Sequence, residues 1–291
     1  MIKTIDPSAI SQPELHAYLL AAVAPRPICF ASTVAADGKV NLSPFSFFNV
    51  FSSNPPVLIF SPARSGRDGS LKHSHQNVKE VPEVVINIVN YPIVEQMSLS
   101  STAYDKGVNE FIKAGLTQVP SEKVRPPRVG EAPVALECSV TEVIELADTP
   151  GAGNLILAKV ELIHINEKYL TDDALDTQKL DLVGRMGESW YTRASGAALF
   201  EIPKPLRTKG IGVDSLPVSV RESKILTGNN LGRLGNLERV PTTSEMDMIR
   251  KSDEVKTKGL ADDIAKVHQL AKAWLAEGRT QDALSLLFSF A

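Results

Sequence analysis

The chain contains 291 residues, 43% of them hydrophobic and 22% charged, which is the composition of a globular protein able to bury a substantial core. Its formal charge is −3, from 31 Lys and Arg against 34 Asp and Glu, and this excludes nucleic-acid binding through bulk positive charge. No uncharged apolar run approaches the roughly 20 residues that span a bilayer, and residues 1–10 lack the apolar run of a secretory signal. We expect a cytoplasmic protein with no membrane or nucleic-acid partner, whose two cysteines, Cys29 and Cys138, are reduced and buried.

The first 60 residues predict one helix followed by several strands. Ser11 is a suitable N-cap and Pro13 a suitable first-turn residue for a helix over 13–23. Asp37-Gly38 is a strong signal for a tight turn between two strands. Apolar, β-branched and aromatic runs bounded by turn residues place the expected strands at 28–34, 40–42, 45–51 and 56–60.

Strands and short helices follow one another irregularly between residues 72 and 165. In the expected strand 134–141, apolar residues alternate with polar or small ones, the pattern of a half-buried strand. Because strands do not alternate regularly with helices, a doubly wound parallel sheet is disfavoured, and we expect a mainly β protein built on a closed or nearly closed antiparallel barrel with short helical excursions. The other expected elements are strands at 83–90 and 154–165, helices at 72–80, 92–99 and 108–114, and an extended Pro-rich loop at 120–133.

The last third of the chain has a different composition. Residues 203–241 are rich in Gly, Pro and polar residues, and we expect this segment to wrap over a surface without building a core. From Thr243 onward the pattern is helical, and we expect a C-terminal helical extension that packs on the barrel or on a partner subunit. Its apolar stripe, at alternating spacings of four and three residues, consists of Leu260, Ile264, Val267, Ala271 and Trp274.

Several kinds of chemistry lack their sequence motif. The chain has no Walker-type glycine loop, and no dinucleotide fingerprint follows a strand and opens a helix. His73 and His75 are two residues apart, so on a helix they do not share a face and do not predict a metal site. Ser46 lacks the context of a hydrolase nucleophile. We therefore predict no metal site and no catalytic side chain.

Residues 41–49, Asn-Leu-Ser-Pro-Phe-Ser-Phe-Phe-Asn, form an unusual strand. Hydroxyl and amide side chains interleave with aromatic ones, and Pro44 removes a backbone hydrogen-bond donor. Such a strand can offer hydroxyl groups and backbone amides to a flat heteroaromatic ligand, while Phe45, Phe47 or Phe48 shapes the wall. An ordinary barrel strand with aromatic residues is the alternative interpretation.

Together with this strand, several other segments carry a resemblance to one family. They are Ala24-Pro25-Arg26-Pro27-Ile28 with Ala31-Ser32-Thr33, then Ser52–Leu58, Lys72-His73-Ser74, Val85-Ile86-Asn87, Gly107–Phe111, Ala132–Cys138 and Gly184-Arg185-Met186-Gly187. In this order they resemble the flavin reductase-like, FMN-binding split-barrel family, which includes flavoredoxins and the reductase components of two-component monooxygenases. The resemblance covers residues 13–205, and residues 210–235 resemble an extension found in part of this family. Lys-His-Ser stands where the family has Lys-Asp-Thr, and Gly187-Glu188 where it has Gly-Gly.

The resemblance implies a Greek-key-like split barrel over residues 1–205, followed by an extended segment and helical appendage over 206–291. It also implies FMN at the interface of a homodimer, with NAD(P)H as the substrate that supplies reducing equivalents and with a monooxygenase or another flavin-accepting partner. The residues implied at the ring and ribityl chain are Ser32, Thr33, Ser46 and Asn49. Those implied at the phosphate are Lys72, Ser74 and Asn77, with further charge from Arg64 or Arg67. Pro44, Phe45 and Arg185 are further implied cofactor-binding residues.

Three functions are compatible with this resemblance. The first is an NAD(P)H-dependent FMN reductase, in which the flavin carries the redox chemistry and the protein supplies position and solvent exclusion. The second is a flavoredoxin-like electron-transfer protein that receives electrons from a protein partner. The third is a flavin-binding protein without redox turnover.

Overall fold

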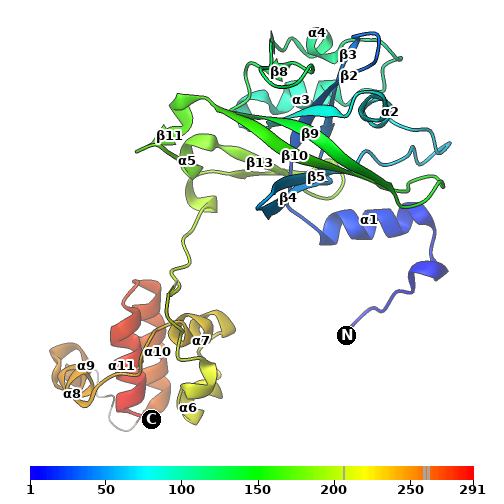
Figure 1. Cartoon of the computed structure of the whole chain (residues 1–291). Coiled ribbons are helices and arrows are strands. Elements are labelled where there is room, and N and C mark those ends of the chain that lie inside the picture. Colours follow the sequence, from blue (N-terminus) through cyan, green and yellow to red (C-terminus); the bar gives the residue numbers. More distant parts are fainter. Residues whose placement is uncertain (206, 258–259, 261–262) are drawn as a thin grey trace. The chain divides into compact units, whose positions relative to one another are not determined.

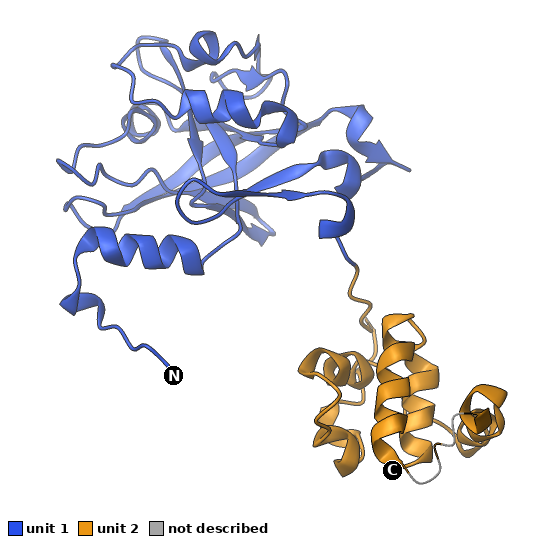
Figure 2. Cartoon of the chain, turned by 180° about the vertical axis from the view of Figure 1, so that it is seen from behind, with its two compact units in different colours: residues 1–200 blue, residues 201–291 orange. Residues whose placement is uncertain are grey.

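The computed structural model describes residues 1–205, 207–257, 260 and 263–291. The chain forms two compact units, Met1–Phe200 and Glu201–Ala291, which Figure 2 shows in blue and orange. The boundary expected after residue 205 lies next to residue 206, which is outside the described residues. Each unit is described here by itself.

Unit 1 (residues 1–200) is built on a large antiparallel sheet (Figure 1). In the described part of the chain this sheet has seven strands, in the order β3-β2-β6-β9-β10-β5-β4. Its strands are β2 (Cys29–Val34), β3 (Val40–Phe45), β4 (Phe48–Ser53), β5 (Pro56–Phe60), β6 (Glu83–Ile88), β9 (Val134–Glu145) and β10 (Asn154–Ile165).

The connection between the two edge strands defines the shape of the sheet. β3 and β4 lie at opposite edges, yet Ser46 and Phe47 alone separate them in the chain. The sheet must therefore curl until its edges approach each other. Consistent with this curl, the ring of Phe45 at the end of β3 lies 5.3 Å from the ring of Phe60 in β5. The result is the mainly β, antiparallel split-barrel fold expected from the sequence, with its two edges adjacent.

The barrel interior contains the cysteines. Every residue of β2 is buried, and its side chains alternate between two apolar clusters, with Phe30 in one and Cys29 and Ala31 in the other. Cys29 and Cys138 are buried and form no disulfide, as expected. Burial raises the pKa of both thiols, that of Cys138 to about 12, so neither is a thiolate at neutral pH.

Smaller sheets complete the β structure of unit 1. The short strand β1 (Arg26–Pro27) pairs with β13, and this pairing brings the segment before β2 next to residues about 160 positions later. The Pro-rich loop expected at 120–133 contains the short strand β8. The remaining strands are β7 (Gln118–Val119), β8 (Arg128–Val129), β11 (Leu170–Thr171), β12 (Ala174–Leu175), β13 (Leu182–Arg185) and β14 (Tyr191–Ala194).

Short helices surround the sheet. The first has the predicted cap, because the Ser11 side chain accepts from the N–H of Glu14 while the Glu14 carboxylate accepts from Ser11. Gly115 ends another helix with φ of 64°, a conformation that favours glycine. The helices of unit 1 are α1 (Gln12–Ala22), α2 (His73–Glu80), α3 (Val94–Ser100), α4 (Glu110–Ala114) and α5 (Thr177–Leu180), with 3-10 turns at Pro7–Ala9, Tyr91–Ile93, Glu167–Tyr169 and Gly196–Ala198.

Unit 2 (residues 201–291) is helical. Its helices are α6 (Val218–Arg221), α7 (Gly228–Gly235), α8 (Thr243–Lys251), α9 (Asp253–Thr257), α10 (Ile264–Ala276) and α11 (Thr280–Ser289), with a 3-10 turn at Val213–Ser215. Residues 258, 259, 261 and 262, in the region expected to be helical, lie outside the described residues. Among the helices that the structure describes, none is long and apolar enough to cross a membrane.

Unit 2 has an apolar core of its own. Trp274 is 1% exposed within this core, and its Nε1 donates to Glu254 at 2.7 Å. The expectation that residues 203–241 build no core was wrong, since Leu216 and Leu234 are buried there. Apolar residues are sparse along this segment, because each short helix contributes only a few of them. The core was therefore not evident from the sequence pattern and is seen only in the folded structure. In the predicted stripe, Ile264, the first residue of helix α10, is exposed.

Candidate functional site

The N-terminus of α2 has the properties of an anion-binding end. The helix starts at His73, with Lys72 as its N-cap residue, and no side chain caps it. Its first backbone bond runs from the N–H of Gln76 to the carbonyl of Lys72, so the N–H groups of the first turn have no partner within the helix. The exposed Lys72 side chain adds positive charge beside them. A phosphate or carboxylate would therefore be stabilised at this end.

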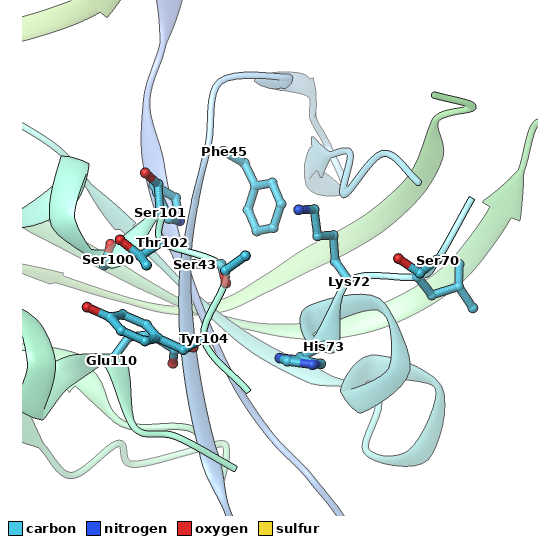
Figure 3. A pocket seen from close by; sticks show the side chains of 13 residues that line it. Ser43, Phe45, Ser70, Lys72, His73, Ser100, Ser101, Thr102, Tyr104 and Glu110 are labelled. Carbon is cyan, nitrogen blue, oxygen red and sulfur yellow. The ribbon is translucent and has the colours of Figure 1, made fainter. Parts of the chain in front are cut away.

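A cavity of about 220 Å³ opens beside this helix end. Figure 3 shows the side chains of Phe45 and Lys72 lying next to each other, with the hydroxyl groups of the loop after α3 across the cavity. Hydroxyl-bearing residues are the commonest part of the lining, which suits a polyhydroxylated ligand. They are Ser43, Ser70, Ser100, Ser101, Thr102 and Tyr104.

Two further cavities lie along β3 toward the β3–β4 connection. A second cavity, of about 270 Å³, shares Pro44, Phe45 and Ser101 with the first. A third, of about 310 Å³, shares Arg26 and Ser46 with the second. The polar and aromatic strand singled out in the sequence thus borders three cavities that share lining residues, and we refer to them together as the β3 groove.

Two other predicted residues lie further along the groove, in its third and second cavities. Asn49 is exposed on β4 and lines the third cavity, where its Oδ1 accepts from the N–H of Val50 at 2.8 Å. Arg185 lies in the second cavity together with Tyr191. The structure therefore brings Pro44, Phe45, Ser46, Asn49, Lys72 and Arg185 to one groove.

Four further predicted residues, Ser32, Thr33, Ser74 and Asn77, are buried, and the last three form hydrogen bonds between α2 and the sheet. Nδ2 of Asn77 donates to Oγ1 of Thr33 at 3.1 Å, and Nδ2 of Asn41 donates to Oγ of Ser74 at 3.0 Å. Ser32 Oγ is buried without a hydrogen-bond partner among the described residues. Ser32, Thr33 and Ser74 are fully buried and do not line the groove, and Thr33 and Ser74 instead position α2 against the sheet. Their predicted contacts with a ligand remain predictions.

Arg64 is engaged away from the groove. Its Nη2 donates to Glu145 at 2.9 Å, and its other nitrogens donate to the carbonyls of Ala147 and Gly69 at 3.1 and 3.3 Å. These contacts connect the loop before α2 to the end of β9. Arg64 does not line the cavity that contains Lys72, so the structure does not bring these two predicted phosphate residues together.

Arg26 was quoted in the sequence motif, but its role was not predicted. It is 6% exposed and lines the second and third cavities. Its Nη1 donates to the carbonyls of Leu20 and Val23 at 2.6 and 2.7 Å, and its Nη2 donates to the carbonyl of Met186 at 2.9 Å. Burial, and then the positive charge of Arg185, lower its pKa. Arg26 thus connects the end of α1 to the turn between β13 and β14.

Glu110 was also not predicted. It is 3% exposed, lines the first cavity, and its Oε2 accepts from the N–H of Leu42 at 2.8 Å. Burial raises the pKa of this carboxyl. Glu110 belongs to the segment Gly107–Phe111, which is one of the segments that resemble the family. The presence of an acidic residue in that segment was the signal that could have identified it.

A curled antiparallel sheet whose two edges approach each other, with cavities beside the uncapped N-terminus of α2, defines a split-barrel protein with a candidate ligand site. The chain belongs to the flavin reductase like domain family, whose model matches residues 22–179.

Relatives of similar length to unit 1 support this assignment. An uncharacterised protein of Aquifex aeolicus is 34% identical over 189 residues, which are 65% of this chain and 94% of that protein. One of Halalkalibacterium halodurans is 34% identical over 189 residues, which are 64% of this chain and 90% of that protein. Since both are uncharacterised, they support the family and specify no activity.

Solved structures confirm the fold. Nitrilotriacetate monooxygenase component B from Bacillus cereus superposes with a TM-score of 0.65 at 25% identity, covering 69% of this chain and 99% of that one. A protein with a split barrel domain from Shewanella frigidimarina superposes with a TM-score of 0.58 at 24% identity, covering 68% of this chain and 96% of that one. Flavoredoxin of Desulfovibrio vulgaris superposes with a TM-score of 0.54 at 21% identity, covering 71% of this chain and 98% of that one. The last two show similarity of fold alone.

Proposed function

We propose that this protein is an FMN-binding flavin reductase that transfers reducing equivalents from NAD(P)H to the flavin or to a downstream acceptor. The observation that carries the proposal is the position of Lys72 at the uncapped start of α2, where a hydroxyl-lined cavity opens into the β3 groove. Membership of the flavin reductase like family supports the choice of a flavin as ligand.

In this proposal the FMN phosphate binds at the N-terminus of α2. The N–H groups of the first turn donate to the phosphate, and Lys72 contributes a charged hydrogen bond. Asn77 and Ser74 hold α2 in place through Thr33 and Asn41. The serine and threonine hydroxyls of the first cavity suit the ribityl chain.

The flavin ring then lies along β3 and the β3–β4 connection. Pro44 and Phe45 supply apolar contact, while Ser46 and Asn49 supply polar groups further along the groove. FMN supplies the capacity to accept a hydride and pass on electrons. The protein's own residues bind the ring, orient it and limit its exposure to water, and these roles need no general base.

A second subunit completes the groove in this proposal. The edge strand β4 presents an apolar surface next to the third cavity, where Val50 and Phe51 are 62% and 65% exposed. Exposed apolar residues beside a binding groove are typical of an interaction surface. A two-fold dimer would cover both copies of this surface and create two equivalent sites. Sedimentation at low protein concentration, read together with flavin content, tests this, and a monomer with full FMN affinity would contradict it.

The absorption spectrum of the purified protein tests the main proposal. We expect a flavin spectrum after purification or after addition of FMN, and bleaching when NADH or NADPH is added without oxygen. No flavin uptake would overturn the proposal. Flavin uptake without bleaching by either nicotinamide would favour the flavoredoxin-like alternative, in which a protein partner supplies the electrons.

A further inference from the structure

One buried carboxyl of the site has no role in the proposed function. Glu110 begins the short helix α4, which packs beside β3. The residue is 3% exposed, yet it lines the first cavity, the one that opens beside Lys72. Glu110 therefore borders this cavity from the interior of unit 1 and not from the surface.

Glu110 has fewer hydrogen-bond partners than Glu137, which is also buried. Among the residues that the structure describes, Glu110 forms no ion pair with a lysine or an arginine, and its carboxyl accepts only from backbone N–H groups, that of Leu42 at 2.8 Å and its own. Both oxygens of Glu137 accept hydrogen bonds, from N–H groups of the Pro-rich loop and from His164. A buried carboxyl costs free energy unless its hydrogen bonds are made, and an ionised one can accept about four of them. The carboxyl of Glu110 thus retains capacity to bind a ligand.

The two ends of the first cavity differ in charge. Figure 3 shows Lys72 directed toward Phe45, with Glu110 on the far side of the cavity from it. A phosphate is stabilised at the Lys72 end by positive charge and by the start of α2. At the other end an ionised Glu110 would repel a phosphate. The end of the cavity at Glu110 is therefore suited to a part of the ligand that carries no negative charge.

A hydroxyl group is the ligand partner that Glu110 favours. Burial raises the pKa of its carboxyl, and backbone N–H groups and the charge of His73 oppose this rise. A protonated His73, which lines the same cavity, would also repel a cationic ligand, and among the described residues no group of acidic, His or Cys side chains could hold a metal ion. A hydroxyl is neutral, donates to an ionised carboxyl and accepts from a protonated one. It therefore suits either form of Glu110.

We propose that Glu110 binds the hydroxyl groups of a polyol chain whose phosphate lies at Lys72, and that it makes the first cavity specific for such a chain. The inference rests on the proposed function in that the ribityl chain of FMN is the polyol. The hydroxyl groups of Ser43, Ser101 and Thr102 line the same cavity and offer further hydrogen bonds to the chain. Ligand binding then accounts for the buried carboxyl, because an uncharged amide could equally accept from the N–H of Leu42. Glu110 is a binding residue in this inference and takes no part in electron transfer.

Two flavins that differ only in the polyol chain test the proposal. Lumiflavin has the ring of riboflavin with a methyl group in place of the ribityl chain, and fluorescence quenching measures the affinity of the full chain for each. We expect Glu110→Ala to weaken riboflavin binding by about tenfold, through loss of hydrogen bonds to the chain, and to leave lumiflavin binding unchanged. Glu110→Gln keeps polar atoms at the same place and should recover most of the riboflavin affinity. Glu142→Ala, which removes an exposed carboxylate from β9, is the matched control and should bind both flavins as the unchanged protein does.

The pair of flavins separates a ligand contact from a structural role. If Glu110 only supported β3 through Leu42, Glu110→Ala would weaken both flavins alike, because the proposed ring site lies along the same strand. Equal losses for riboflavin and lumiflavin, or an unchanged riboflavin affinity, would overturn the proposal. Where a thermal melt shows that Glu110→Ala does not fold, Glu110→Asp makes the same test with the same expected result, because it withdraws the carboxyl by one methylene group.

Ribitol 5-phosphate distinguishes failure of this inference from failure of the proposed function, because it has the polyol and the phosphate without the ring. We expect calorimetric titration to show binding that Glu110→Ala weakens by about tenfold. If this result is obtained but no flavin binds, the flavin proposal fails and the role of Glu110 stands. If flavins bind but neither riboflavin nor ribitol 5-phosphate depends on Glu110, the proposed function stands and the inference is wrong. Binding of neither the flavins nor ribitol 5-phosphate would overturn both.

Discussion

The two units of this chain bury different kinds of side chain. In unit 1 the buried residues include amides, hydroxyls, carboxyls and a guanidinium, such as Asn77, Thr33, Glu110, Glu137 and Arg26. Among the described residues of unit 2, the buried polar ones are a histidine and two serines, and the core is otherwise apolar.

This difference indicates that the two cores have different roles, positioning of groups around the site in unit 1 and stability in unit 2. A buried polar group stabilises a fold only when its hydrogen bonds are made, and it then fixes the positions of the groups that it contacts. In unit 1 these bonds hold α2 and the end of α1 beside the groove, and they hold the Pro-rich loop against β9. In unit 2 the buried side chains that pack the helices are mostly apolar, and polar contacts such as that from Trp274 to Glu254 supplement them. We therefore expect substitutions in unit 1 to change binding, and core substitutions in unit 2 to change stability alone.

The largest expected effect is on the stability of unit 2. Leu284 is fully buried in its core, and Leu284→Ala should lower the free energy of unfolding of unit 2 by about 2–5 kcal/mol through lost burial and a cavity. The two tryptophans make this measurable, because Trp190 lies in unit 1 and Trp274 in unit 2. Denaturant unfolding followed through Trp274 in a Trp190→Phe background should show the loss.

The same variant tests whether the units differ as proposed. FMN affinity of Leu284→Ala should match that of the unchanged chain, since the proposed site lies in unit 1. A parallel loss of flavin binding would show that unit 2 contributes to the site, and the contrast between the two cores would then need revision. Ile264→Ala, at an exposed position of α10, is the matched control and should leave both quantities nearly unchanged.

The next effect is on ligand affinity in unit 1. Lys72→Ala removes a charged hydrogen bond to the proposed phosphate, and we expect a loss of about 1.5–3 kcal/mol in FMN binding, or roughly tenfold to a hundredfold. Riboflavin, which has no phosphate, should bind both proteins alike. Fluorescence quenching with the two flavins measures this. Equal losses of affinity for FMN and riboflavin would show that Lys72 does not bind the phosphate.

The sequence predicted the elements of unit 1 better than it predicted the site. The strand Pro56–Phe60 and the Asp37-Gly38 turn were predicted because their signals are local. The role of Arg26 was missed because one of its partners, Met186, is 160 residues away and is brought near by the pairing of β1 with β13. The burial of Ser32 and Ser74 could not be inferred either, because it depends on how α2 packs on β2 and β3.

Glu137 tests whether buried polar groups hold unit 1 together. Burial alone would raise the pKa of this carboxyl, but hydrogen bonds from the N–H groups of Glu122 and Lys123 and from His164 outweigh burial and lower it. A lowered pKa means that Glu137 stabilises the fold above its ordinary pKa of 4.5 and that this contribution is lost as the pH falls below it. Glu137→Gln should cost about 1–3 kcal/mol at pH 7.

The pH dependence is the decisive readout for Glu137. Stability of the unchanged protein should decrease as the pH falls below 4.5, and this decrease should be smaller in Glu137→Gln. Urea unfolding at several pH values, followed through Trp190, measures both. An identical pH dependence in the two proteins would show that the carboxylate charge does not contribute to holding the loop of residues 120–133.

Substitution of Glu110 should have the smallest effect on stability, and its pH dependence should be opposite to that of Glu137. Burial raises its pKa above 4.5, so the folded state favours the protonated carboxyl, and stability decreases as the pH rises from 4.5 through the raised value. Glu110→Gln keeps an oxygen that can accept from the N–H of Leu42 and removes the buried charge. Above that range the variant should be as stable as the unchanged protein or up to about 1 kcal/mol more stable. The same urea series checks this. A loss of more than about 1 kcal/mol at pH 7 would mean that the ionised carboxylate is needed where it lies, beside the first cavity.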